Sequence, residues 1–267
     1  LYFKMKSKML IAKKKINNLP KITIITVVLN GEKTIGRCIR SVANQNYPRK
    51  KIEHIVLDGG SKDKTVSVIK KYKNDLAYWH TKVDKGIYDA MNTGIKKSKG
   101  DIIGILNSDD YFNKNALKKV SEYFKKYEID FLFGSVKKSR IYHNYFPNKI
   151  WFTFNIYPSH SVSFFIRRKA QKKIGYYNTS FKYSADRDLV YRIIRKKLKG
   201  TSTKKSEIFG TFSLSGVSSR VSYFEKITEE FRIRLSNKEN LFKTVLIMTI
   251  TVIYHFLKKI QNRIFEK

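Results

Sequence analysis

The hydrophobic positions along the chain follow two periods. Continuous runs of β-branched and aliphatic residues predict buried strands. Apolar residues spaced by three and four predict helices with one buried face. The predicted strands cover residues 21–30, 51–61, 100–110 and 129–136. The predicted helices cover residues 32–45, 62–73, 87–99 and 115–127.

Strands that alternate with helices predict an α/β fold with a doubly wound, mostly parallel sheet flanked by helices. The pattern is less regular beyond residue 136, where we expect a strand and a short helix over 160–178 and a helix over 184–197. Ligands of such sheets bind at the carboxyl ends of the strands. Asp58 and the pair Asp109–Asp110 stand at predicted strand ends, so we expect them at the site.

A different pattern begins near the C-terminus, where the 14 residues of 244–257 include no Lys, Arg, Asp or Glu. A helix of that length spans ~21 Å, less than the ~30 Å of a bilayer core, so we expect no membrane crossing. Apolar positions at helical spacing, with a polar stripe and basic edges, predict an amphipathic helix that lies in a membrane interface. The alternative is a helix packed on its own domain or on a second subunit. We therefore expect a main domain at residues 19–225 and a helical tail at 226–267.

The composition adds a formal net charge of +35. Clustered cations favour nucleic acid, but the 43 lysines and 13 arginines are scattered along the whole chain. That distribution disfavours a dedicated nucleic-acid-binding protein and fits attraction to an anionic membrane leaflet. The single cysteine, Cys38, stands on the apolar face of a predicted helix, where we expect a core residue. It fits a reducing cytoplasm, and the lysine-rich first residues do not resemble a secretory signal.

Asp109 and Asp110 are adjacent in "NSDD", and two neighbouring carboxylates repel unless a cation offsets them. One or two carboxylates on a strand-end loop, completed by substrate phosphates, commonly hold Mg²⁺ or Mn²⁺. The alternative is a solvated turn, because Asn, Ser and Asp are frequent in turns.

Two further segments carry polar groups at element ends. In "LDGGSKDKT", Asp58 precedes two glycines that let a ligand approach the backbone, and its carboxylate can accept hydrogen bonds from a base or ribose. An ordinary Gly-rich turn is the alternative. In "DKGIYDAMNTGI", Lys85 and Asp89 stand near a helix start, for which a capped helix is the alternative.

Taken together, these segments resemble the family 2 glycosyltransferases, whose nucleotide-sugar-binding domain has the GT-A fold. The matching pieces run in the family's order over about residues 21 to 195. They are "ITVVLNGEKTI", "QNYPRKKIEHIVLDGGSKDKT", "DKGIYDAMNTGI", "GDIIGILNSDDYF" and "SADRDLVYRI".

The resemblance implies roles for particular residues. Asp58 would meet the nucleotide base, Lys85 the nucleotide or its phosphates, and Asp109 the metal as the aspartate of the DXD motif. Asn107 replaces that motif's first Asp, and Leu29 stands where many members place an aromatic residue against the base. The expected donor-binding residues are Leu29, Asn30, Asp58, Lys85, Asp89, Asn107 and Ser108. The expected metal ligands for Mn²⁺ or Mg²⁺ are Asp109, Asp110 and His160.

On the acceptor side, the resemblance matches Asp186 in "SADRDLVYR" to the family's general base. The alternatives are that Ser184 and Asp186 only cap the helix, or that Asp188 is the base. His160 is similar to a histidine found here in related sequences, with an acceptor-side or metal role. A single base without a protein nucleophile implies inversion at the anomeric carbon.

The resulting hypothesis is a metal-assisted, inverting glycosyltransferase on the inner face of the cell membrane. It would move a sugar from a nucleoside diphosphate donor, UDP-linked by preference, to a glycan or lipid-linked acceptor. The alternatives are another nucleotide-sugar enzyme such as a nucleotidyltransferase, and a basic nucleic-acid-binding protein. The sequence leaves the oligomeric state open.

Overall fold

The central strand of the molecule is β1 (Ile22–Val28), and all its residues are buried. The computed structural model describes residues 18–151, 153–154, 156–158, 161–213 and 221–265. In it, β1 pairs in parallel with β2 (Ile52–Asp58) on one side and with β4 (Ile102–Ile105) on the other. A strand with neighbours on both sides and helices on both faces is buried, which explains its mostly apolar sequence. Its two polar residues, Thr23 and Thr26, are buried as well and form hydrogen bonds with Glu53 and His54 of β2.

Four more strands complete a seven-stranded sheet of order β10-β6-β9-β4-β1-β2-β3. They are β3 (Tyr78–Thr81), β6 (Phe131–Phe133), β9 (Phe164–Arg167) and β10 (Gly200–Ser202). Only β9 runs antiparallel to its neighbours in this sheet. The predicted doubly wound, mostly parallel sheet is therefore confirmed.

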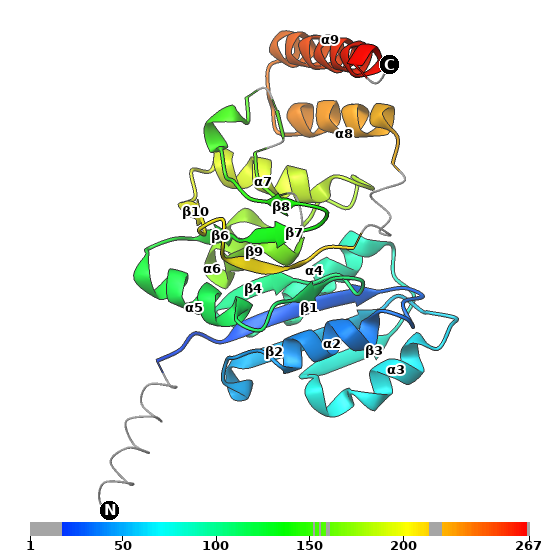
Figure 1. The fold of residues 1–267 in the computed structure, drawn as a ribbon, viewed down its shortest axis with the longest axis vertical. Coiled ribbons are helices and arrows are strands. Elements are labelled where there is room, and N and C mark those ends of the chain that lie inside the picture. The colour runs from blue at the N-terminus through cyan, green and yellow to red at the C-terminus, as the bar shows by residue number, and fades with distance from the viewer. Residues whose placement is uncertain (1–17, 152, 155, 159–160, 214–220, 266–267) are drawn as a thin grey trace, which may run out of the picture.

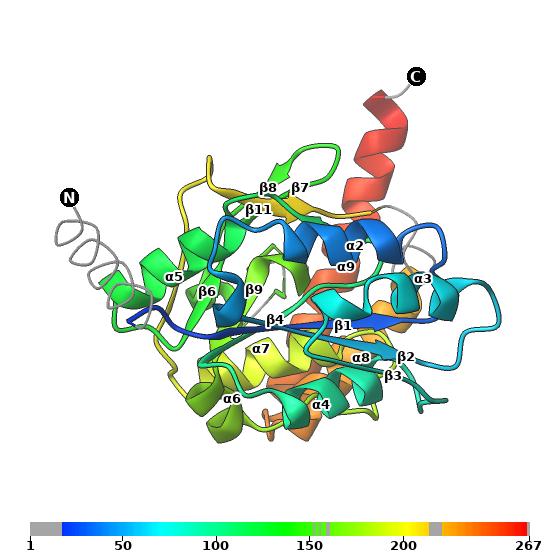
Figure 2. The ribbon, with the colours of Figure 1, turned by 90° about the horizontal axis from the view of Figure 1, so that it is seen from below.

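Helices cover the two faces of this sheet in two groups (Figures 1 and 2). One face packs against α2 (Ile35–Ala43), α3 (Thr65–Lys71) and α5 (Ala116–Lys126). The other packs against α4 (Ile87–Lys97), α6 (Arg168–Ile174) and α7 (Ala185–Arg195). The predicted buried face of α2 is confirmed, and it includes Cys38, which is fully buried. Burial raises the pKa of the Cys38 thiol to about 12, as expected of a core residue.

A second sheet, which the sequence analysis did not predict, has the order β5-β11-β7-β8. Its strands are β5 (Tyr111–Phe112), β11 (Ile208–Thr211), β7 (Ser135–Lys137) and β8 (Ile141–Tyr142). Each has two to four residues, too few to show a period. The sheet matters for the site because β5 begins directly after Asp110 and pairs with β11. Short 3₁₀ turns lie at Arg49–Lys51, Lys73–Asp75, Pro147–Lys149 and Ser161–Ser163.

Two helices stack beyond α7 at one end of the molecule, with α9 (Leu241–Phe265) outermost and α8 (Tyr223–Ser236) beneath it (Figure 1). α8 begins with a capping box between Ser222 and Glu225, and most of this helix lies within the helical tail expected at residues 226–267. The expected division between residues 225 and 226 falls inside α8, and that division stays a prediction.

Gly104 offers a test of how tightly the centre of the sheet is packed. A Cβ at this position of β4 would lie 2.5 Å from Cε1 of the fully buried Phe165 on β9. We expect Gly104→Ala to lower the free energy of unfolding by about 1–3 kcal/mol, the usual cost of overpacking. Urea denaturation of the purified chain measures this change.

Gly36 in α2 is the matched control, because a Cβ there would meet only side-chain atoms at ordinary distances, those of Tyr72 and Val68 at 3.4 Å and that of Arg40 at 3.7 Å. Alanine is also the better helix former by about 1 kcal/mol. We expect Gly36→Ala to leave stability unchanged or raise it. A Gly104→Ala protein as stable as the wild type would contradict the tight packing of Phe165 across β4.

Candidate active site

The predicted site residues gather because three parallel strands end at the same edge of the sheet. Val28 at the end of β1 is in register with Asp58 at the end of β2. On the other side of β1, the Leu106 N–H donates to the Ile25 carbonyl as the chain leaves β4. The turns after β1, β2 and β4 therefore lie side by side, as the sequence analysis expected.

Asp58 organises the turn after β2. Its side chain is 1% exposed, and its Oδ2 accepts hydrogen bonds from the N–H groups of Gly60 (3.1 Å) and Ser61 (3.0 Å). The hydroxyls of Ser61 and Thr81 also donate to this carboxylate. Asp58 thus shapes one of the loops at the edge of the sheet where β1, β2 and β4 end, which we call the ligand edge. Its predicted contact with the nucleotide base stays a prediction.

The turn after β1 is tied to this loop by Asn30, whose φ of 53° is in the left-handed region. The Asn30 N–H donates to Ser61 Oγ (2.7 Å), and Asn30 Oδ1 accepts from the Lys62 N–H (2.9 Å). Asparagine tolerates this backbone better than most residues. Leu29 beside it is 62% exposed, so its side chain is open to contact by a ligand.

Lys85 and Asp89 lie at the start of α4. Lys85 is exposed, and its N–H donates to Asp89 Oδ2 at 3.3 Å. The next residue, Gly86, has a φ of 115°, and its N–H donates to Asp84 Oδ1. A Cβ at Gly59 would lie 2.7 Å from Asp84 Oδ2, so this segment reaches the turn after β2. Asp89 thus closes the turn before α4, although the helix itself has no side-chain capping hydrogen bond. The Lys85 segment lies beside the turn after β2, and the predicted roles of Lys85 and Asp89 in donor binding stay predictions.

The loop after β4 holds the paired carboxylates in two different environments. Asp109 is partly exposed, whereas Asp110 is fully buried. Asp110 Oδ1 accepts from the Ser213 N–H at 2.9 Å. Burial, together with the nearby charge of Asp109, raises the pKa of Asp110 to about 7, and burial raises the pKa of Asp109 as well. A solvated turn would show neither shift.

Two buried oxygens in this loop have no hydrogen-bond partner within the described part of the chain, Asn107 Oδ1 and Asp110 Oδ2. They flank Ser108 and Asp109 in sequence. Buried polar atoms are nearly always paired, so these oxygens are candidates for a bound cation. Among the described residues there is no cluster of three His, Cys, Asp or Glu side chains. The donor set therefore fits Mg²⁺ or Mn²⁺ held by one or two carboxylates and completed by phosphates. His160, the third expected ligand, lies outside the described residues.

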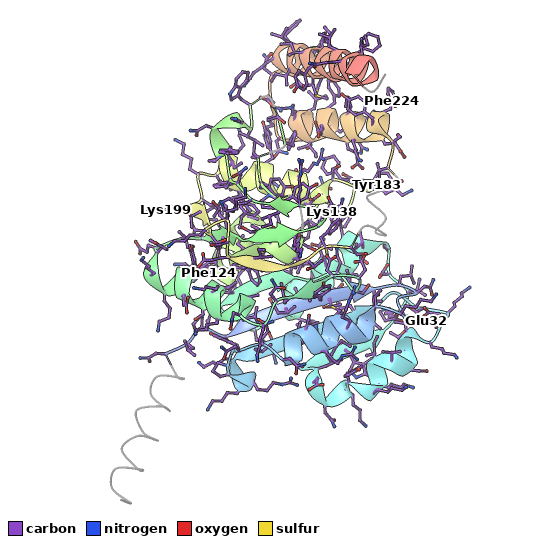
Figure 3. All side chains as sticks on the ribbon, viewed as in Figure 1. Glu32, Phe124, Lys138, Tyr183, Lys199 and Phe224 are labelled. Carbon is purple, nitrogen blue, oxygen red and sulfur yellow. The ribbon has the colours of Figure 1, made fainter. Side chains whose placement is uncertain are left out.

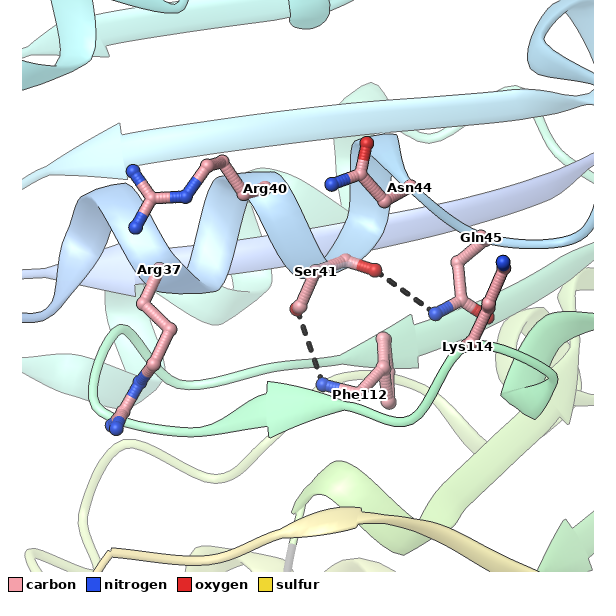
Figure 4. A pocket seen from close by; sticks show the side chains of 7 residues that line it. All are labelled: Arg37, Arg40, Ser41, Asn44, Gln45, Phe112 and Lys114. Carbon is pink, nitrogen blue, oxygen red and sulfur yellow. Dashed lines mark hydrogen bonds between the residues drawn. The ribbon is translucent and has the colours of Figure 1, made fainter.

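Arg37 on α2 is a residue that the sequence analysis did not single out. Its Nη2 donates to the Asp109 carbonyl oxygen at 2.9 Å, and its guanidinium stacks 4.5 Å from the centre of the Tyr111 ring. Arg37 thereby supports the loop from outside. It also lines a groove of about 620 Å³ together with Arg40, Lys114 and four other residues (Figure 4). Nothing in the sequence linked an exposed arginine of this helix to the acidic loop.

Asp186 occupies the first turn of α7, partly exposed. The hydroxyl of Tyr88 lies 3.3 Å from its Oδ1, and the hydroxyl of Tyr157 donates to its Oδ2 at 3.3 Å. Burial raises the pKa of the Asp186 carboxyl, and the neighbouring Arg187 opposes that rise. Ser184 makes no side-chain capping hydrogen bond. The two tyrosines, from separate parts of the chain, orient this carboxylate.

Asp188, the rival candidate for the base, is engaged elsewhere. It is 2% exposed, forms an ion pair with Arg192 (2.9 Å), and accepts a hydrogen bond from Asn237 Nδ2 (2.9 Å). A carboxylate held by two partners in the interior is a structural group. The structure therefore favours Asp186 over Asp188 as the reactive carboxylate.

α8 holds the segment that leads into Asp186. Glu229 of α8 is buried and accepts hydrogen bonds from the N–H groups of Lys182 (2.7 Å) and Tyr183 (3.1 and 3.2 Å). Tyr183 lies directly beneath α8 in Figure 3. Arg187 forms an ion pair with Glu230. These contacts link residues more than 40 positions apart, so no local sequence pattern could predict them.

Among the described residues, no helix is both long enough and apolar enough to span a membrane.

Comparison with solved structures confirms the GT-A fold. Staphylococcus aureus TarS (residues 1–349) in complex with UDP-GlcNAc superposes with a TM-score of 0.64 and 18% identity, covering 88% of this chain and 72% of that one. The mannosyltransferase PcManGT from Pyrobaculum calidifontis, in complex with GDP-Man and Mn²⁺, has a TM-score of 0.65 at 17% identity. It covers 88% of this chain and 69% of that one.

Curated relatives match over shorter segments. An uncharacterized glycosyltransferase of Mycobacterium tuberculosis is 42% identical over 94 residues, which are 35% of this chain and 36% of that protein. The poly(ribitol-phosphate) beta-N-acetylglucosaminyltransferase TarS of Staphylococcus aureus is 29% identical over 120 residues, 44% of this chain and 21% of TarS. The chain thus spans about a third and a fifth of these relatives. An uncharacterized glycosyltransferase of Rickettsia typhi is 30% identical over 193 residues, 66% of this chain and 59% of that protein.

The family model for glycosyl transferase family 2 matches residues 23–194. This segment runs from β1 through α7 and includes every turn described above. Because the match covers more than half of the sequence, the chain belongs to glycosyl transferase family 2.

Proposed function

We propose that the chain transfers a sugar from a nucleoside diphosphate donor to a hydroxyl group of a glycan or lipid-linked acceptor. The observation that carries this proposal is the environment of Asp186. Its carboxylate is partly exposed and is oriented by two tyrosine hydroxyls, and burial raises the pKa of this carboxyl. A base with a raised pKa accepts a proton more readily once it is ionised. Asp186 also lies within the segment that matches the family.

The donor would bind at the edge formed by the turns after β1, β2 and β4. Leu29 would contact the base, the turn shaped by Asn30 and Asp58 would line the nucleoside, and Lys85 would face the phosphates. Asn107 and Ser108 would contact the donor, and Asp109 and Asp110 would hold Mn²⁺ or Mg²⁺, with His160 as a further ligand. When bound, the cation supplies positive charge that offsets the charge of the leaving diphosphate.

In the proposed reaction, Asp186 takes the proton of the acceptor hydroxyl while that oxygen bonds to the anomeric carbon. The bond between this carbon and the diphosphate oxygen breaks, and the nucleoside diphosphate leaves with the electron pair. A single displacement without a protein nucleophile inverts the anomeric configuration. The hydroxyl groups of Tyr88 and Tyr157 keep the carboxylate in place during the step.

We propose a UDP-sugar as the donor, supported by the structural neighbour that binds UDP-GlcNAc. The neighbour with GDP-Man and Mn²⁺ supports the use of a divalent cation. A panel of UDP-, GDP- and dTDP-sugars, assayed for hydrolysis with Mn²⁺, Mg²⁺ or EDTA, tests both points. Release of intact nucleoside diphosphate also separates glycosyl transfer from nucleotidyl transfer, which would cleave within the diphosphate.

Asp109→Asn is expected to lower donor hydrolysis by about 100-fold or more, because the change removes the exposed carboxylate of the cation-binding loop. Binding of UDP, measured by calorimetry with and without Mn²⁺, should lose its dependence on the metal. The matched control is Asp101→Asn, at the opposite end of β4, where the exposed carboxylate accepts a hydrogen bond from the Lys21 N–H. Equal loss in both variants would argue against a cation site at Asp109.

Asp186→Asn and Asp188→Asn separate catalysis from structure. The first should lower kcat for donor hydrolysis by about 10²–10⁴-fold, the usual contribution of a general base, and leave UDP affinity and stability unchanged. The second breaks the buried pair with Arg192, so we expect a stability loss of roughly 1–3 kcal/mol with most of the activity retained in the folded protein. If Asp188→Asn lowered kcat to this extent and Asp186→Asn left it unchanged, Asp188 would be the base.

A further inference from the structure

The outermost helix, α9, presents an apolar face that no part of the described structure covers. Its inner face packs on α8 through Thr244, Ile247 and Met248, which are 0–7% exposed. The opposite face carries seven exposed large apolar side chains: Phe242, Leu246, Ile250, Ile253, Phe256, Leu257 and Ile260. Phe242 is 85% exposed and Phe256 is 64% exposed. We call these seven residues the outer face of α9.

The spacing of these residues explains the geometry of the outer face. Positions 242, 246, 250, 253, 257 and 260 recur every three or four residues, so they form one stripe along the helix. Positions 244, 247 and 248 fall on the other side. α9 has 25 residues, which corresponds to a length of about 38 Å. α9 is the outermost helix of the α7–α8–α9 stack, on the far side of α8 from the sheet (Figure 1), and its C-terminal part extends beyond the other elements (Figure 2).

The charge of α9 indicates what covers this face. Residues 241–265 include four basic residues, Lys243, Lys258, Lys259 and Arg263, and no acidic residue. A second copy of α9 would bring like charges together within a chain of net charge +35. An anionic lipid surface offers both the apolar medium and the opposite charge.

α9 is connected to α7 through the polar contacts of Glu239. Glu239, between α8 and α9, accepts hydrogen bonds from Tyr191 of α7 (2.8 Å) and Arg234 of α8 (2.9 Å). It also pairs with Lys243 of α9 (3.0 Å). Arg234 is 1% exposed and donates to two carbonyls near residue 150 as well. Glu239 thus joins all three helices, and α7 carries Asp186 at its first turn.

We propose that α9 lies in the interface of an anionic bilayer, with its outer face toward the lipid, and that the α7–α8–α9 stack holds Asp186 at a fixed orientation to that surface. The acceptor is then a glycan carried on a lipid and presented at the membrane. The second statement rests on the proposed function, whereas binding of the bilayer does not.

The test uses the full chain and vesicles of phosphatidylcholine with or without phosphatidylglycerol, followed by sedimentation. The variant carries Phe242→Ser, Leu246→Ser and Ile253→Ser. The control carries Tyr127→Ser, Ile141→Ser and Phe146→Ser, three exposed apolar residues that lie outside α9. We expect the wild type and the control to bind anionic vesicles, more weakly as salt is raised, and the outer-face variant to bind at least about tenfold more weakly.

Two further measurements complete the test. One is the rate at which each protein hydrolyses the UDP-sugar, and the other is its oligomeric state, from light scattering. We expect all three proteins to hydrolyse the donor equally and to have the same mass. The proposal is overturned if the wild type does not bind anionic vesicles, or if the outer-face variant binds them as well as the control does. It is also overturned if the wild type is a dimer and the outer-face variant is a monomer. Vesicle binding without hydrolysis of any donor would leave the membrane proposal standing and overturn the proposed function.

Discussion

Parallel pairing of β1 with β2 and β4 is the constraint on which the rest of the structure depends. Parallel strands must be joined by crossovers, so helices cover both faces and the central strands β1, β2 and β4 are buried along nearly their whole length. The same pairing brings the chain out of the sheet three times at one edge. Polar residues that would be unfavourable inside the sheet, such as Asp58 and Asn107, stand just where each strand ends. The core and the ligand edge thus have a common origin.

The edge of the sheet alone does not place Asp186, the proposed general base, which depends on the helices beyond the sheet. Asp186 is oriented by Tyr88 from α4 and Tyr157 from an irregular segment. Glu229 of α8 holds the backbone that precedes it. Because α8 is itself joined to α9 at Glu239, the C-terminal helices are linked to the segment that carries Asp186.

Long, strongly periodic segments could be predicted from the sequence, whereas contacts between residues far apart in the sequence could not. β1 and the buried face of α2 follow directly from their apolar pattern, and Cys38 was correctly expected in the core. β5, β7 and β8 are too short for any period to show. Asp186 could be selected from its motif, but its preference over Asp188 required partners such as Arg192 and Asn237. Arg37 illustrates the limit, because its bond to the Asp109 carbonyl joins residues 72 positions apart.

The two adjacent carboxylates, Asp109 and Asp110, have different surroundings, which explains why a very basic chain keeps them side by side. Successive side chains of a loop point in different directions, so one carboxylate can face the ligand edge while the next turns inward. Asp110 points inward and accepts the N–H of Ser213, which fastens the segment after β11 to the acidic loop. Asp109 is partly exposed, and Arg37 holds its carbonyl from the outer side. Asp110 Oδ1 and Arg37 thus brace the loop from two sides and leave the Asp109 carboxylate, together with the unpaired Oδ2 of Asp110, available to a cation, which would also relieve the repulsion between the pair.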